Sequence, residues 1–270
     1  MIAGKTWREL RVMALVYLAI LELLTVPVIL LWPDIYADLQ RSTLLRNMGV
    51  DWLKRIGEGV SNRDEDVAYL NWIAVMLFFR SANLVGLAAA VLLGTGLFAR
   101  ERESHTFEFL LARPVTRGSI LWQKSWPTAL CLLLPLFLAN LSALYWSAQI
   151  DLHIPVDRLL WATAHAAAFT LCFLAATTWM SVRCRVQAHV AFIIGGLTIL
   201  QIGIYLTQRW RVASLFRLAD FEWYAPILTG NITPAQMFDP IHERGFTTWI
   251  LFATVVFYAL AWRELRRAEP

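Results

Sequence analysis

Six long apolar runs constrain the fold of this chain more than any other feature. A helix needs about 20 mostly apolar residues to cross a hydrocarbon core about 30 Å thick, and its backbone must satisfy its own hydrogen bonds there. We therefore predict an all-α integral membrane protein with six transmembrane helices in a single transmembrane domain, residues 1–270. The predicted spans are about 12–32, 70–99, 120–146, 159–182, 188–207 and 246–262.

The composition of the chain excludes a soluble protein. Hydrophobic residues make up 58% of the chain and charged residues only 16%, against about 45–50% and 25% in soluble domains. The three cysteines show no metal-ligand spacing, so we expect neither a metal site nor a disulfide framework. The net charge of +4 is attributed to membrane orientation, with lipid and not nucleic acid as the partner.

Basic residues indicate how the chain lies in the membrane. The N-terminus, the segment 100–124, the link 183–185 and the C-terminus carry more basic than acidic residues, whereas the other connections are net acidic. By the positive-inside rule, both termini and segment 100–124 are cytoplasmic in a multi-pass protein of the cell (inner or plasma) membrane. The outer segments after the first and fifth spans carry scattered apolar residues, which favours interfacial or re-entrant helices there.

The segment Arg100 to Lys124 is the one densely charged passage between two long apolar runs. Its first part, about 100–112, has the pattern of a short amphipathic helix with Phe107, Leu110 and Leu111 on one face. Pro114 then favours a break before the next helix. Such a helix either docks on a partner protein or lies on the membrane with its apolar face in lipid.

Residues 101–117 read ERESHTFEFLLARPVTR and are followed by Lys124. With six predicted spans, this stretch resembles the intracellular motif of the membrane subunits of ABC-2 type ABC transporters. His105 stands where that family usually has glycine. The resemblance implies that the helix couples to an ATPase, through Glu101, Arg102, Glu103, Thr106, Phe107, Glu108, Leu110, Leu111, Pro114 and Arg117.

The resemblance also implies partners for this chain. It implies a second membrane subunit, identical or different, two cytoplasmic P-loop ATPase subunits that carry the ATP and Mg²⁺, and export as the direction of transport. No G-x-x-x-x-G-K-[ST] occurs in the sequence, so we expect a transport subunit that is not an enzyme and binds no cofactor itself. The alternatives are a membrane anchor that recruits a non-ATPase partner and, less favoured, an intramembrane enzyme.

Three polar side chains lie within the predicted spans. Glu22 in the first span and Arg80 in the second lie at similar depth if the spans begin where we place them, and Asn83 is near Arg80. An ionised residue at mid-bilayer costs about 2.5–3.5 kcal/mol, so each needs a partner or water. We favour a structural Glu22–Arg80 ion pair over a polar lining of a substrate path.

Small residues recur every four positions on two of the predicted spans. Such stripes let helices approach closely and predict packing faces. They are Gly86, Ala90 and Gly94 on the second span, and Ala164, Ala168, Cys172 and Ala176 on the fourth.

Overall fold

The computed structural model describes residues 2–41, 51–62, 64–112, 115–207, 209–243 and 245–267, whose regular secondary structure is entirely helical. The first half contains α1 (Ile2–Leu30), α2 (Trp32–Arg41), α3 (Asp51–Val60), α4 (Glu65–Ile73), the π-helix η2 (Ala74–Val85), α5 (Gly86–Thr95), α6 (Ala99–Glu103), α7 (Phe107–Leu111) and α8 (Arg117–Ala148). The second half contains α9 (Val156–Arg183), α10 (Gln187–Leu206), the 3₁₀ turns η3 (Arg211–Ala213) and η4 (Leu215–Ala219), α11 (Phe221–Thr229), α12 (Pro234–Phe238) and α13 (Phe246–Arg267).

Six stretches of helix in the described residues are long and apolar enough to cross a membrane, which confirms the predicted number. The second of them runs from Glu65 to Glu103, through α4, η2, α5 and α6, and so begins before the predicted 70. The stretches are Ala3–Leu30, Glu65–Glu103, Arg117–Ala148, Val156–Arg183, Gln187–Leu206 and Phe246–Arg267.

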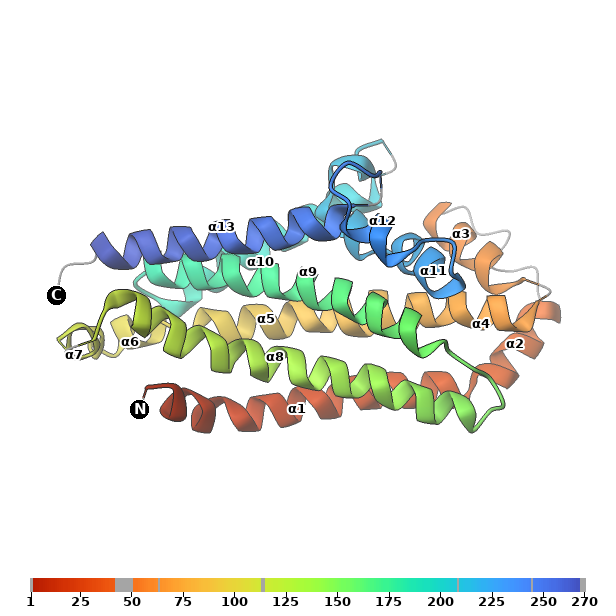
Figure 1. Cartoon of the computed structure of the whole chain (residues 1–270), viewed down its shortest axis with the longest axis horizontal. Helices are drawn as coiled ribbons and strands as arrows, with labels where there is room; N and C mark the ends of the chain where they lie inside the picture. Colours follow the sequence, from red (N-terminus) through yellow and green to blue (C-terminus); the bar gives the residue numbers. More distant parts are fainter. Residues whose placement is uncertain are drawn as a thin grey trace.

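The two ends of the bundle differ in what they carry. Both termini lie at one end, together with α6 and α7, and we call it the terminal end (Figure 1). The short helices α2, α3, α11 and α12 gather at the opposite end, which we call the loop end (Figure 1). The charged segment therefore lies at the same end of the bundle as both termini.

The loop end is fastened to the spans by buried polar side chains. Asn83 of η2 donates to the Ala219 carbonyl (3.0 Å) and to the Tyr224 hydroxyl (2.8 Å). His165 of α9 lies within hydrogen-bond distance of the Leu218 carbonyl (2.9 Å) and the Thr247 hydroxyl (2.8 Å). Because Asn83 and His165 are fully buried, these bonds satisfy groups that water cannot reach. Asn83 thus connects η2 of the second span to η4 and α11.

The expected ion pair between Glu22 and Arg80 is absent from the part of the chain that the structure describes. Glu22 instead accepts a hydrogen bond from the Ser142 hydroxyl of α8 (3.0 Å). Arg80 donates to the Leu24 carbonyl of α1 (2.7 Å), three residues before Pro27. Arg80 sits in the π-helical η2, whose residue spacing differs from that of the α-helix assumed in the prediction, and its side chain reaches α1 at Leu24 and not at Glu22.

The two stripes of small residues serve different contacts. On α5, a Cβ added to Gly86 would meet Thr170 Cγ2 at 2.7 Å, and one added to Gly94 would meet Thr177 at 2.8 Å, so these glycines allow α5 to approach α9 closely. The stripe on α9 does not make this contact, because the residues of α9 that meet the two glycines are Thr170 and Thr177. Cys172 of the stripe lies close to Thr254 of α13. Ala90 and Ala168 are both buried.

Replacing Gly94 by alanine should weaken the contact between α5 and α9. The new methyl group would overlap Thr177, and such overpacking costs about 1–3 kcal/mol of stability. Gly195→Ala on α10 is the matched control, since a Cβ there meets no atom within 4 Å. Thermal unfolding in detergent should show a lower transition temperature for Gly94→Ala alone; equal transitions would contradict the close contact.

Candidate functional site

The charged segment forms two short helices where the sequence predicted one helix over about 100–112. Helix α6 ends at Glu103 and α7 begins at Phe107, with residues 104–106 forming a turn between them. In this turn the Thr106 amide donates to the Glu101 carbonyl (2.8 Å), and the Ser104 and Thr106 hydroxyls lie 2.9 Å apart. Thr106 therefore helps to close the end of α6.

His105 adopts a left-handed backbone conformation, with φ of 54°. Glycine reaches this conformation freely, whereas other residues pay roughly 1–2 kcal/mol for it. A glycine, which the resemblance leads us to expect at this position, would adopt this conformation without strain. The substitution by histidine leaves the turn intact and adds backbone strain.

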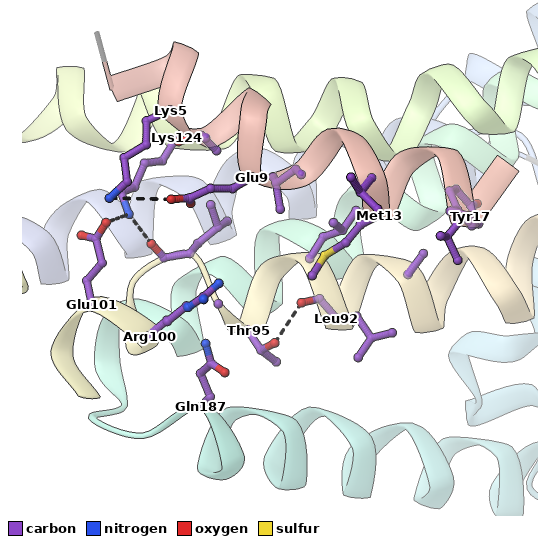
Figure 2. A pocket seen from close by; sticks show the side chains of 18 of the residues that line it. Lys5, Glu9, Met13, Tyr17, Leu92, Thr95, Arg100, Glu101, Lys124 and Gln187 are labelled. Atoms are coloured by element: carbon purple, nitrogen blue, oxygen red, sulfur yellow. Dashed lines mark hydrogen bonds and ion pairs between the residues drawn. The ribbon is translucent and has the colours of Figure 1, made fainter. Parts of the chain in front are cut away.

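Glu101 is held inside the protein by Lys124 of α8. The Lys124 ammonium lies 2.6 Å from Glu101 Oε1 and donates to the Leu97 carbonyl at 2.6 Å (Figure 2). Lys124 is also within 5.1 Å of the centre of the Phe98 ring. The Lys124 side chain is only 7% exposed, so Glu101 supplies the charge that this buried cation needs.

Helix α6 is also tied to α9 and α10. The Ser181 hydroxyl of α9 accepts from the Phe98 and Ala99 amides (both 3.0 Å) and donates to the Thr95 carbonyl (2.8 Å). Arg102 donates to the Arg183 carbonyl (3.4 Å), and Glu103 accepts from the Gln187 amide at the start of α10 (3.4 Å). With Lys124, these contacts connect α6 to α8, α9 and α10.

The expected position of Phe107 on an outward apolar face is wrong. Phe107 is 8% exposed and belongs to a cluster that includes Ile120 of α8, Val182 of α9 and Leu265 of α13. The guanidinium carbon of Arg102 lies over the Phe107 ring, 4.5 Å from its centre. Phe107 therefore fixes the start of α7 to the bundle and is unavailable as a partner contact.

Among the described side chains of α6, α7 and the link to α8, the exposed large apolar ones are Phe109 and Val115, and the carboxylate of Glu108 lies beside Phe109 in the chain. Phe109 is 76% exposed and Val115 38% exposed, and Glu108 is exposed as well. The sequence analysis did not select Phe109 as a contact residue, because it placed Phe107 on one helix face with Leu110 and Leu111. Two residues apart on a helix, Phe107 and Phe109 point to different sides, so only one of them can be buried against the bundle.

Four other residues of the predicted site complete its description. Arg117 is the first residue of α8, which begins after Thr116, whose hydroxyl accepts from the Ser119 amide at 3.3 Å. Leu110 and Leu111 lie in α7, but their side chains fall outside the described residues, as does Pro114 entirely. Groups of three or more His, Cys, Asp or Glu that could hold a metal ion are absent from the described residues.

A bundle of six helices long and apolar enough to cross a membrane, with a charged connection at the end that carries both termini, defines the class of polytopic membrane proteins. The family model of the ABC-2 family transporter protein matches residues 3–220, which include the first five spans and the charged segment. The chain belongs to this family and is a membrane subunit of a transporter of the ABC-2 type. A comparison with curated proteins gives no match.

Removing the Glu101 carboxylate should destabilise the terminal end, because it leaves the Lys124 ammonium buried beside only the Leu97 carbonyl. Breaking a buried pair in this way costs about 3 kcal/mol. The double variant Glu101→Ala/Lys124→Met should cost less than the sum of the single changes, and Glu108→Ala, at an exposed carboxylate, should cost little. Denaturant unfolding of the wild type, Glu101→Ala, Lys124→Met, the double variant and Glu108→Ala measures this, and additive costs would show that the pair contributes nothing.

Substitutions at His105 should follow the preference for left-handed backbone. His105→Gly is expected to raise stability by up to about 1 kcal/mol, and His105→Val to lower it, since a β-branched residue fits this conformation worst. Transition temperatures should rank glycine above histidine and histidine above valine. A valine variant as stable as the glycine variant would be incompatible with the positive φ.

Proposed function

We propose that this chain is the membrane subunit of an ATP-driven exporter, that it forms dimers, and that α6 and α7 couple it to separate ATPase subunits. Both termini and this segment would then face the cytoplasm from the cell membrane, as the positive-inside rule favours. The observation that carries the proposal is the exposed Phe109, placed on a helix whose neighbour α6 is fastened to the spans.

The fastening of α6 supports a mechanical role. A coupling element has to pass a displacement to the membrane helices without deforming on the way. Helix α6 continues the second span and contacts α8 through Glu101, α9 through Arg102 and α10 through Glu103. A push on α7 therefore reaches four of the six spans through hydrogen bonds and an ion pair.

The outward surface supports binding of a protein partner. Interfaces are anchored by a few aromatic or arginine side chains that enter pockets, with polar residues around them. Phe109 has the exposure and size of such an anchor, and the neighbouring Glu108 supplies a charged rim. The Leu110 and Leu111 side chains remain further candidates for this contact.

The ATP and Mg²⁺ belong to the partner in this proposal. The sequence contains no P-loop, whose glycine-rich backbone and lysine bind nucleotide phosphates. The energy for transport would therefore enter through the docking surface. Dimer formation and export follow from family membership and are proposed on that ground.

Phe109→Ala should weaken the association with the ATPase without unfolding the membrane subunit, because Phe109 contributes little to the bundle. We expect about a tenfold or greater loss of copurified ATPase, the size typical of an interface anchor. Phe192→Ala is the matched control, since Phe192 is 79% exposed but lies on α10. Purification from native membranes, followed by ATP-hydrolysis and transport assays, measures the effect.

The double variant Leu110→Ala/Leu111→Ala should uncouple ATP turnover from transport in the same assays. Normal coupling in both this variant and Phe109→Ala would refute the docking assignment. Copurification of a non-ATPase protein through Phe109 would favour the membrane-anchor function instead.

A further inference from the structure

A large cleft opens beside the charged segment, between α1 and the second span. Its volume is about 1190 Å³, which exceeds the roughly 300–1,000 Å³ of sites for drug-sized ligands. Figure 2 shows its two kinds of lining: Lys5, Glu9, Arg100, Glu101, Lys124 and Gln187 at one end, with Met13, Tyr17 and Leu92 further along. The cleft is thus charged at the terminal end and apolar toward the middle of the bundle.

The cleft exists because its two walls pack on different helices. Helix α1 packs along α8, whereas α5 packs along α9. Where α5 faces α1 it presents the small side chains of Ala88 and Ala89, which leave the space between the walls unfilled. Val16 and Leu92, on opposite walls, are 54% and 72% exposed.

The apolar part of the cleft has the depth of one membrane leaflet. On α1 its lining runs from Leu10 to Ile20, a rise of about 15 Å at 1.5 Å per residue. Half of a hydrocarbon core about 30 Å thick is about 15 Å. A lipid chain that entered at the charged end would therefore reach the bilayer midplane at the inner end of the cleft.

The charges at the mouth favour an anionic headgroup. Lys124 is already held by Glu101 and the Leu97 carbonyl. Among the residues that the structure describes, Lys5 pairs with Glu9 alone, through an exposed i,i+4 contact at 3.7 Å, a type of pair worth about 0.3–0.5 kcal/mol. Arg100 is exposed. The mouth thus carries three cations, Lys5, Arg100 and Lys124, against the two carboxylates of Glu9 and Glu101. Arg100 and Lys5 can turn to a phosphate at little cost.

From this arrangement we propose that the cleft binds an anionic phospholipid of the leaflet at the terminal end. The phosphate lies between Arg100 and Lys5, and an acyl chain runs along Val12, Val16 and Ile20 of α1 and Ala88 and Leu92 of α5. Basic pockets between membrane helices recognise anionic headgroups in this way. Phe109 of the docking surface also lines the cleft, but the lipid contacts proposed here do not include it, so either proposal can fail while the other stands.

The charge requirement is tested with the purified full chain in nanodiscs of phosphatidylcholine and phosphatidylglycerol, by native mass spectrometry of the retained lipid. The wild type should retain phosphatidylglycerol in preference. Arg100→Gln should reduce this preference about fivefold, since one basic residue near the headgroup contributes about 1 kcal/mol. Arg185→Gln, at an exposed arginine of the terminal end outside the cleft lining, should leave it unchanged.

The acyl-chain position is tested by filling the cleft. Ala88→Phe places a ring in the space, and Ala191→Phe places the same ring on the exposed surface of α10. Retained lipid of both headgroup types should fall only in Ala88→Phe, with the transition temperature of both variants checked by thermal unfolding.

Three results would overturn the proposal. They are no preference for phosphatidylglycerol in the wild type, equal effects of Arg100→Gln and Arg185→Gln, and unchanged lipid retention in Ala88→Phe. Loss of a dimer in Ala88→Phe, with lipid retention intact, would assign the cleft to a second copy of the chain.

Discussion

Polar groups inside an apolar bundle must find partners within the protein, and this requirement shapes both ends of the molecule. A buried cation without a partner is strongly unfavourable, so Lys124 binds both Glu101 and the Leu97 carbonyl where the second span passes from α5 to α6. At the loop end, the buried side chains of Asn83 and His165 find their partners in the carbonyls of Ala219 and Leu218. The short helices are therefore parts of the bundle and not loose connections.

This constraint divides the charged segment into an inner and an outer part. Glu101, Arg102 and Phe107 are used within the protein, which fixes the position of α6 and of the start of α7. Glu108 and Phe109 remain on the outside. A segment built in this way can bind a partner on one side and pass the resulting displacement to the spans on the other. The mouth of the cleft shares Glu101 and Lys124 with this segment, so a bound lipid would touch the same ion pair.

Some features of the site were predictable and others were not. Repeated apolar runs predicted the six spans, and the residues from Glu101 to Arg117 predicted the family. The pattern placed Phe107 on the outside, because helical spacing groups residues by face without saying which face meets the bundle. It also paired Glu22 with Arg80, since the π-helical turns of η2 and the competing Ser142 and Leu24 partners leave no trace in the apolar pattern.

The sequence by itself determined the architecture, because membrane insertion depends on the length and hydrophobicity of each segment, and both are local properties. The tertiary structure alone decided which charges are internal, which aromatic residue is exposed and where a cleft remains. These depend on which helices pack together: α1 on α8 and α5 on α9 leave the cleft open, and the packing of α8, α9 and α13 around Phe107 turns Phe109 outward. Such contacts join residues far apart in the chain, so no local pattern encodes them.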